Sequence, residues 1–263
     1  MHDKKRIGII GFGKIGSYLN KELKATEAVE IKWVYDTDEK ALQKVPESLR
    51  ATGWDKTLSR EVDLVVETAN FKAVEEFAPE ILKETNMAIM STTALADKNL
   101  LQDLKAICRK NSSRLFVPHG AILGLDGIQD GKSSLESVKI VTTKPPQNLD
   151  YSFTEKWNRE DIKSKTVLYE GPTFNLCQIF PRNVNVHASI ALAGLGFQDT
   201  YSRLIADPET DKAQHSVEAK GPGLTLRVQK ADYIEGVTGT YTLESTINSL
   251  KRILDETRTI QIY

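Results

Sequence analysis

A short apolar strand that runs directly into a glycine-rich turn is the feature that most constrains the fold of this chain. Residues 5–10 read Lys-Arg-Ile-Gly-Ile-Ile, and Gly11, Gly13 and Gly16 then follow with the spacing Gly-x-Gly-x-x-Gly. An amphipathic helix begins there. In this context the first glycine permits a tight turn, the second lets the backbone approach a pyrophosphate, and the third lets helix and strand pack closely. The segment predicts a Rossmann-type unit with a dinucleotide at the helix N-terminus.

A second apolar strand, over residues 31–35, ends in Asp36, which follows Gly16 by 20 residues. A carboxylate at this place accepts hydrogen bonds from the adenosine ribose and repels a 2′-phosphate. Asp36 therefore favours NAD, while the nearby Lys40 leaves NADP possible. An ordinary glycine turn followed by a surface aspartate is the alternative. With Asp36, the residues expected to bind the cofactor here are Gly11, Phe12, Gly13, Lys14, Ile15 and Gly16.

Apolar strands alternate with amphipathic helices through the first part of the chain. Further strands are expected at 63–67, 87–91 and 114–117, and helices at 39–44, 71–83 and 97–110. This alternation predicts an α/β fold with a doubly wound parallel sheet that helices cover on both faces.

The pattern changes after about residue 120. The expected elements are a strand at 138–142, a polar, turn-rich excursion at 147–165, a helix rich in small residues at 183–195, and strands at 201–206, 216–219 and 224–229. Consecutive strands of this kind predict an α+β second domain with a mainly antiparallel sheet.

A helical stripe near the end of the chain is expected to return to the first domain. The stripe consists of Leu243, Ile247, Leu250 and Leu254. The predicted domains are therefore 1–118 with 238–263, for the dinucleotide, and 119–237, for substrate and oligomerisation. A homo-oligomer, with a dimer favoured, is expected because an open antiparallel sheet face or edge must be covered.

Composition excludes several classes of partner. Among 263 residues, 35 basic and 36 acidic side chains give a net charge of −1, so no long-range field attracts nucleic acid or an anionic membrane. No apolar run approaches the roughly 20 residues that span a bilayer. Cys108 and Cys177 fit no metal-binding spacing and are expected to be reduced and buried. The chain enters a strand with no room for a signal peptide, so we expect a cytoplasmic enzyme.

Several short segments, in the same order along the chain, resemble the L-aspartate dehydrogenase family. They are Val-Glu-Thr-Ala-Asn at 66–70, Ser-Thr-Thr-Ala-Leu-Ala-Asp at 91–97, Pro-His-Gly-Ala-Ile-Leu-Gly-Leu-Asp at 118–126, Thr-Lys-Pro-Pro at 143–146, Phe-Pro-Arg-Asn-Val-Asn-Val at 180–186, and Ala-Asp-Pro at 206–208 followed by His215. The resemblance extends over about residues 5–255. It implies a two-domain, NAD(P)-dependent enzyme that oxidises L-aspartate to iminoaspartate, which hydrolyses to oxaloacetate and ammonia or enters NAD biosynthesis.

The resemblance also implies roles for individual residues. His215 matches the catalytic histidine, and an imidazole suits a general base because its ordinary pKa is near 6.5. On the residues alone, a strand histidine in an ordinary polar cluster is the alternative. The implied cofactor contacts are Thr68, Ala69 and Asn70 near the adenosine and pyrophosphate, and Thr92, Thr93 and Ala94 near the nicotinamide ribose. The implied substrate contacts are His119, Gly120, Ala121, Asn185 and His187.

Several of these residues also have a purely structural interpretation. His187 also suits core packing among small residues, and His119 suits a loop position without a functional role. Asn183 and Asn185 are both suited to cap a helix, Asn183 above all. A dicarboxylic substrate requires cations or several donors, for which His119, Lys144, Arg182 and backbone N–H groups are candidates. The histidines have no compact metal-binding spacing, and we expect no metal.

The sequence departs from the family pattern at positions that bear on the substrate. His119 stands in place of serine, His187 in place of alanine and Ala213 in place of asparagine, and residues 237–241 lack most of an Asn-Pro-Lys-Thr-Ser run. Imidazoles that replace small groups change the volume and charge of a pocket. Two alternatives stay open: a related dehydrogenase or reductase with another amino, imino or carbonyl substrate, and a non-catalytic dinucleotide-binding sensor.

Overall fold

The computed structural model describes residues 4–26, 28–236 and 238–254. These residues form two compact units. The first contains the described residues up to Pro118 and those of the last helix from Thr246 onward, and the second contains His119–Ser245. Expectations that concern residue 237 and residues 255–263 lie outside the described part of the chain.

The first unit is built on a parallel sheet with the strand order β2-β1-β3-β4-β5. Its strands are β1 (Lys5–Ile10), β2 (Val29–Tyr35), β3 (Leu64–Glu67), β4 (Asn86–Ile89) and β5 (Leu115–Phe116). The order reverses between β1 and β3, since β2 lies on one side of β1 and the later strands lie on the other. Ligands of open parallel sheets bind at such a switch point, beyond the carboxyl ends of the strands. The predicted Rossmann-type sheet is confirmed.

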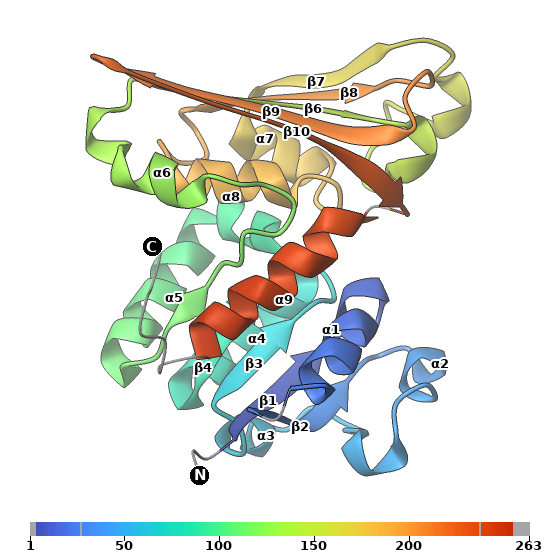
Figure 1. Ribbon diagram of the computed structural model, residues 1–263, viewed down its shortest axis with the longest axis vertical. Helices are drawn as coiled ribbons and strands as arrows, with labels where there is room; N and C mark the ends of the chain where they lie inside the picture. Colours follow the sequence, from blue (N-terminus) through green and yellow to red (C-terminus); the bar gives the residue numbers. More distant parts are fainter. Residues whose placement is uncertain (1–3, 27, 237, 255–263) are drawn as a thin grey trace. The chain divides into compact units, whose positions relative to one another are not determined.

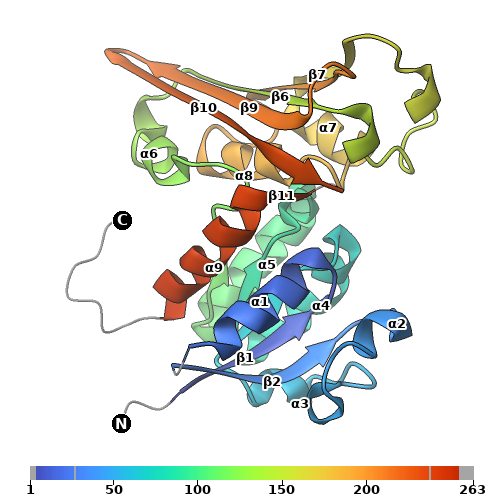
Figure 2. The ribbon, with the colours of Figure 1, turned by 45° about the vertical axis from the view of Figure 1, so that its right-hand side comes forward.

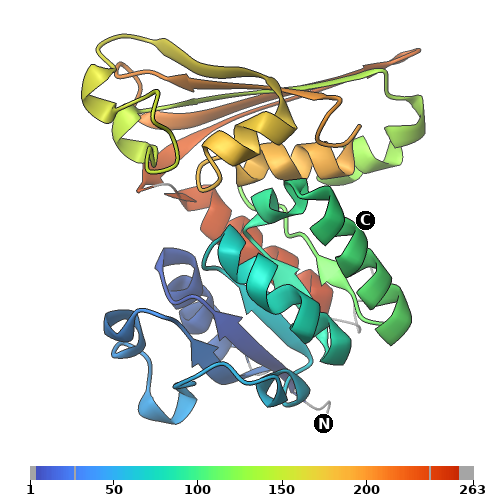
Figure 3. The ribbon, with the colours of Figure 1, turned by 180° about the vertical axis from the view of Figure 1, so that it is seen from behind.

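Helices cover both faces of this sheet, as Figures 1 and 3 show from opposite sides. They are α1 (Lys14–Lys24), α2 (Glu39–Leu42), α3 (Thr57–Arg60), α4 (Phe71–Glu84), α5 (Lys98–Asn111) and α9 (Thr240–Leu254), with the 3-10 turns η1 (Glu47–Leu49) and η2 (Thr92–Ala96). Helices α1 and α9 share one face, and α4 and α5 cover the other. Leu23 of α1 and Ile247 and Leu250 of α9 pack with Ile7 and Ile9 of β1 in one buried cluster.

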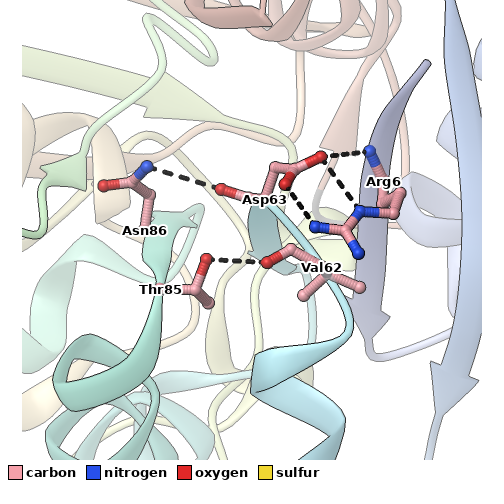
Figure 4. A network of polar contacts seen from close by, with 5 residues as sticks. All are labelled: Arg6, Val62, Asp63, Thr85 and Asn86. Atoms are coloured by element: carbon pink, nitrogen blue, oxygen red, sulfur yellow. Dashed lines mark hydrogen bonds and ion pairs between the residues drawn. The ribbon is translucent and has the colours of Figure 1, made fainter. Parts of the chain in front are cut away.

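A polar network joins the amino ends of β1, β3 and β4 (Figure 4). Arg6 donates from its backbone and its guanidinium group to the carboxylate of Asp63, at 2.8 Å in each case. Asn86 donates to the carbonyl of Asp63 at 3.4 Å, and Thr85 to the carbonyl of Val62 at 2.9 Å. The exposed ion pair is worth little in stability. The network aligns the strand starts at the edge of the sheet opposite the glycine turn.

The second unit has a mixed sheet with the strand order β11-β10-β9-β6-β8-β7. Its strands are β6 (Ser137–Lys144), β7 (Thr166–Pro172), β8 (Thr200–Ala206), β9 (Lys212–Gly221), β10 (Leu224–Glu235) and β11 (Thr238–Gly239). Only β6 and β8 pair in parallel among these described strands, so the prediction of a mainly antiparallel sheet is confirmed.

One face of this sheet carries the helices α6 (Leu125–Asp130), α7 (Thr173–Ile179) and α8 (Asn185–Ala193), as Figure 2 shows. Three 3-10 turns complete the unit: η3 (Lys132–Ser134), η4 (Pro146–Asn148) and η5 (Arg159–Asp161). Strand β7 is not predicted by the sequence, because a polar excursion precedes it and its own pattern is irregular. The long connection from β6 to β8 carries α7 and α8, which is the kind of crossover that parallel neighbours require.

None of the described helices combines the length and the apolar character that crossing a bilayer requires. Both cysteines are free; Cys177 is buried as expected, whereas Cys108, in α5, is only half-buried. The expectation that both are buried is therefore wrong for Cys108.

Candidate functional site

The glycine turn after β1 meets the demands that a dinucleotide makes on the backbone. Gly11 has a φ of +89°, and a Cβ there would lie 2.7 Å from the backbone nitrogen of Ala69. A Cβ on Gly16 would collide with the carbonyl oxygen of Gly11, whereas a Cβ on Gly13 would meet nothing within 4 Å. The first and third glycines thus close the turn, and the second leaves its approach open. Helix α1 begins with no side-chain cap at Gly13. These residues fit a pyrophosphate at this helix N-terminus.

The carboxylate of Asp36 connects the glycine turn to the end of β2. One carboxylate oxygen accepts from the backbone nitrogen of Phe12 at 2.6 Å, and the other accepts from that of Asp38 at 2.8 Å. A carboxylate has about four acceptor sites, so both oxygens keep a lone pair for ribose hydroxyls. Asp36 therefore orients the turn, and its contact with a ribose stays a prediction.

The residues after β3 hold the loops at the switch point together. The hydroxyl of Thr68 donates to the carbonyl of Gly11 at 2.8 Å. The side chain of Asn70 caps α4 by accepting from the backbone nitrogens of Lys72 and Ala73. Thr68, Ala69 and Asn70 therefore have structural tasks beside the glycine turn, and their contact with the cofactor stays a prediction. The same holds for Thr92, Thr93 and Ala94, which are buried in η2.

A buried carboxylate that sequence reasoning did not single out joins the next pair of loops. Glu67, at the end of β3, accepts from the backbone nitrogen of Ala69 at 2.7 Å and the hydroxyl of Ser91 at 2.8 Å. Its other oxygen accepts from the backbone nitrogens of Ser91 and Met90 at 3.1 and 3.2 Å. Burial raises the pKa of Glu67 to about 7, against the effect of these bonds. The only signal in the sequence is an acid that ends an apolar strand.

In the second unit, three neighbouring strands place one polar residue each in a row. His215 of β9 pairs with Thr142 of β6 on one side and with Lys230 of β10 on the other. Directly paired residues share a face of the sheet. The His215 side chain is 4% exposed, and its Nδ1 lies 2.9 Å from the Thr142 hydroxyl.

Basic side chains surround His215. Lys144 follows Thr142 by two residues on β6 and is therefore on the same face; it is 4% exposed, and its Nζ donates to the carbonyl of Asn183 at 3.3 Å. Burial lowers the pKa of Lys144 to about 8; Asp232 opposes the decrease and Lys230 adds to it. Lys230 forms a 2.9 Å ion pair with Asp232. Two lysines facing one carboxylate give the cluster a positive balance that suits an anionic ligand.

A second histidine, His187, is connected to His215 through the hydroxyl of Thr142. His187 of α8 is fully buried, with its Nε2 2.7 Å from the hydroxyl of Thr142 and its Nδ1 2.8 Å from that of Ser202. Burial lowers the pKa of His187 to about 3. The pKa of His215 is also far below its ordinary value, through burial first and then through Lys144, Lys230 and His187. Both imidazoles are neutral at pH 7, and a neutral imidazole can accept a proton.

The remaining predicted residues take varied places. His119, Gly120 and Ala121 lie in the turn before α6, where Gly120 has a φ of +58°, and Asn185 is the first residue of α8. Their contact with substrate stays a prediction. The arrangement does not favour such a contact for His187, because protein hydroxyls occupy both of its ring nitrogens.

Two polar residues before α8 differ from expectation. Asn183 is not the helix cap, since Val184 holds that position; its amide instead pairs with the backbone of Asp150 at 2.8 and 2.7 Å. Arg182 forms a 2.9 Å ion pair with the carboxylate of Asp150 and is half exposed. Within the described ranges, no three His, Cys, Asp or Glu side chains gather in a way that could hold a metal ion.

Comparison with known proteins places these features in a family. The family "Aspartate dehydrogenase, C-terminal" matches residues 126–253, and "Homoserine dehydrogenase, NAD binding domain" matches residues 11–118. An L-aspartate dehydrogenase of Methanococcoides burtonii is 34% identical over 264 aligned positions, covering 95% of this chain and 97% of the relative. The chain belongs to the L-aspartate dehydrogenase family.

Solved structures agree with this membership. The crystal structure of the aspartate dehydrogenase of Thermotoga maritima matches with a TM-score of 0.77 and 30% identity, over 99% of this chain and 100% of that one. A hyperthermophilic archaeal homoserine dehydrogenase, solved with NADPH, matches with a TM-score of 0.60 and 13% identity over 95% and 97% of the two chains; this second likeness concerns the fold alone. The family is one of oxidoreductases, and the glycine turn belongs to its NAD-binding domain.

Proposed function

We propose that this protein oxidises L-aspartate with NAD or NADP to iminoaspartate, which water hydrolyses to oxaloacetate and ammonia. The single observation that carries the proposal is the buried imidazole of His215, in one row with Thr142 and Lys230 and on the same sheet face as the buried Lys144. The identity to L-aspartate dehydrogenases over nearly the full chain supports the choice of substrate.

The chemistry divides between cofactor and protein. A bound nicotinamide accepts the hydride from Cα of the amino acid. His215 takes a proton from the substrate ammonium group, so that the nitrogen lone pair can form the C=N bond as the hydride leaves. Lys144 and Lys230 pair with the substrate carboxylates through charge-assisted hydrogen bonds. These carboxylates offset the positive charges that depress the pKa of His215 and so make it a better base when substrate is bound.

The two parts of the chain have separate tasks in this proposal. Residues 1–118 with 238–263 hold the dinucleotide, through the glycine turn, Asp36 and the loops after β3 and β4. Residues 119–237 hold the amino acid, with His119, Gly120, Ala121 and Asn185 adding contacts to those of the basic cluster. Asp36 gives NAD the advantage over NADP because its carboxylate repels a 2′-phosphate.

We also propose a cytoplasmic homodimer. The two free cysteines fit a reducing compartment. The sheet face of the second unit that carries no described helix presents Tyr201 and Tyr233, which are 36% and 60% exposed, and a second copy would cover them. Sedimentation equilibrium tests this: a mass near 29.4 kDa at micromolar concentration contradicts the dimer.

Replacement of His215 tests the activity. We expect His215→Ala to lower kcat for L-aspartate oxidation by about 10²–10⁴ and to leave NADH binding intact. The matched control is Gln214→Ala, which lies next to it on the opposite, exposed face of β9 and should retain the parental rate. Full activity of His215→Ala contradicts the assignment. A panel of amino acids, and of 2-oxo acids with ammonia, separates L-aspartate from another substrate; binding of NADH without turnover of any of them points to a sensor.

A further inference from the structure

An unbroken chain of buried hydrogen bonds leads from His215 into the second unit. It passes through side chains of β6, α8, β8 and α7 and ends on a backbone carbonyl. The successive contacts are His215 Nδ1 to Thr142 Oγ1 at 2.9 Å, Thr142 Oγ1 to His187 Nε2 at 2.7 Å, His187 Nδ1 to Ser202 Oγ at 2.8 Å, Ser202 Oγ to Thr173 Oγ1 at 2.6 Å, and Thr173 Oγ1 to the carbonyl of Thr200 at 3.0 Å. Apart from His215 itself, each of these side chains is fully buried.

The carbonyl end fixes the direction of the first protons. A carbonyl oxygen only accepts, so Thr173 donates its single hydroxyl proton to Thr200. The bond between Ser202 and Thr173 therefore uses the proton of Ser202. With that proton committed, the bond between His187 and Ser202 requires a proton on Nδ1 of His187.

The remaining protons are fixed in the same way, from His187 to His215. A neutral imidazole carries one N–H, so Nε2 of His187 is an acceptor and Thr142 donates to it. The single hydroxyl proton of Thr142 is then used. The bond between Thr142 and His215 requires a proton on Nδ1 of His215, which leaves Nε2 of His215 with a free lone pair. Reversal of any link would strand the buried carbonyl of Thr200 without this donor.

We propose that His187 is a positioning residue, which acts through Thr142 to hold His215 in the tautomer with a proton on Nδ1 and the accepting lone pair on Nε2. The use of that lone pair as the base for substrate rests on the proposed function; the tautomer does not. The resembling family carries alanine at position 187, so the resemblance does not imply this hydrogen-bond chain. The charged groups that face His215 are Lys144 and Lys230, with Asp232 paired to Lys230, and all three are unchanged in the variants below.

Nitrogen NMR on the intact protein tests the tautomer without any reaction. The protein is labelled with ¹⁵N-histidine, and the signals of His187 and His215 are assigned by their loss in His187→Gln and His215→Gln. At pH 7.5 we expect both rings to show a protonated Nδ1 and an unprotonated Nε2. A protonated Nε2 on His215 overturns the proposal.

Variants of β6 test the effect on the reaction. Thr142→Val keeps the shape of the side chain and removes the hydroxyl, and we expect a fall in kcat of about 10–100-fold with an unchanged dissociation constant for NADH. Thr142→Ser keeps the hydroxyl and should retain most of the rate. Thr143→Val is the matched control, because Thr143 is also buried but points to the other face. In Thr142→Val the ¹⁵N spectrum should show His215 as a mixture of tautomers. A parental rate and a single tautomer in this variant contradict the proposal.

A double-mutant cycle tests the route. His187→Ala should lower kcat as Thr142→Val does, and the double variant should lose no more than the worse single variant, because both changes break the same chain. His187→Gln, whose amide offers one donor and one acceptor, should rescue part of the rate. Multiplicative losses in the double variant overturn the route through Thr142. If His187→Ala does not bind NADH, we take the variant to be misfolded. The Thr142→Val variant and the NMR result on the parent protein then test the proposal.

The activity of His215→Ala tests the proposed function, and the tautomer of His215 in the parent protein tests the positioning by His187. A His215→Ala variant with full activity, together with a protonated Nδ1 in the parent, removes the catalytic role and supports the tautomer. An inactive His215→Ala variant with a protonated Nε2 in the parent supports the catalytic role and overturns the positioning by His187.

Discussion

The two units assemble their polar sites in different ways. In the first, the candidate cofactor site is mostly backbone: three glycines within a single turn set where N–H groups point and how closely a ligand can approach. In the second, the candidate base is placed by side chains from β6, β9, β10 and α8, and Thr142 and His215 are 73 residues apart in the chain. A site built from local backbone can be recognised in the sequence as a motif. A site built by the register of distant strands leaves no such motif.

The buried ionisable groups of the two units also differ in kind, an acid in the first and bases in the second. The first unit buries a carboxyl group, Glu67, whose pKa is raised to about 7. The second buries bases, among them Lys144 and His187, whose pKa values are lowered to about 8 and about 3. Burial favours the neutral form in every case, so the two units should respond to pH in opposite directions.

Among the substitutions that probe this contrast, Lys144→Met should have the largest effect. The pKa of Lys144 falls from 10.5 to about 8 on folding, so at pH 7 the unfolded chain holds this proton more tightly than the folded one. The charged amine therefore costs the fold about 3 kcal/mol, and Met should raise the free energy of unfolding by about that amount. The same variant should raise KM for L-aspartate about 10–100-fold, because a charge-assisted hydrogen bond is lost.

Urea unfolding at pH 7 and steady-state kinetics measure the two effects of that substitution. Lys139→Met is the matched control, since Lys139 lies on the exposed face of the same strand and should change neither quantity appreciably. A stabilised Lys144→Met protein with an unchanged KM would limit the second unit's basic cluster to a structural role.

The glycine turn should separate stability from binding. Gly16→Ala places a Cβ against the carbonyl of Gly11 and should destabilise the protein by about 1–3 kcal/mol. Gly13→Ala has open space around its Cβ and should leave stability nearly unchanged, yet it should weaken NADH binding about tenfold or more because the methyl group occupies the pyrophosphate approach. Thermal unfolding and NADH fluorescence titration check the pair. Unchanged NADH affinity in Gly13→Ala contradicts the site in the first unit.

Acid titration should reveal the opposite signs of the two units. Between pH 4.5 and 7 the folded state binds the Glu67 proton more tightly than the unfolded state, so this group's contribution to stability falls as pH rises through that window. Between pH 6.5 and 3 the unfolded state binds the His187 proton more tightly, so that contribution falls as pH decreases. The two effects oppose each other from pH 6.5 to 4.5.

Glu67→Gln removes the contribution of Glu67 to the pH dependence of stability and leaves that of His187. The variant should lose stability on acidification faster than the parent, by up to about 1.4 kcal/mol per pH unit in this window. Denaturant unfolding at half-unit pH steps measures the slopes, and Glu76→Gln, an exposed substitution on α4, serves as the control. Identical slopes for Glu67→Gln and the parent would show that Glu67 does not titrate in this range.

The smallest effect is expected for Asp36→Asn. The amide oxygen can still accept from the backbone nitrogen of Phe12, so the contact with the glycine turn is kept while the negative charge is lost. The bond from the backbone nitrogen of Asp38 is lost as well, because an amide NH2 group cannot accept a hydrogen bond. The ratio of kcat/KM for NADP to that for NAD should rise, by about tenfold at most. Asp38→Asn, which changes the cap of α2, is the comparison. An unchanged ratio would mean that another group selects the cofactor.

The sequence predicts the first unit more completely than the second. Glycine spacing, strand–helix alternation and the acid after the second strand are local signals, and the parallel sheet follows from them. In the second unit, the parallel pairing of β6 with β8 and the contacts of His187 depend on which strands become neighbours. Pattern alone gives no register, so His187 could be placed among small residues but not opposite Thr142. Glu67 was missed for a related reason: its four donors come partly from a loop more than twenty residues away.

Helix α9 has a consequence for how the protein is made. Ile247 and Leu250 complete the buried cluster that β1 and α1 begin at the other end of the described chain. A ribosome must therefore synthesise the chain through Leu250 before the hydrophobic interior of the first unit can close. Until then, the apolar side chains of β1 and α1 that pack against α9 are accessible to chaperones and proteases. A fragment that ends at Pro118 lacks α9 and keeps this apolar surface exposed.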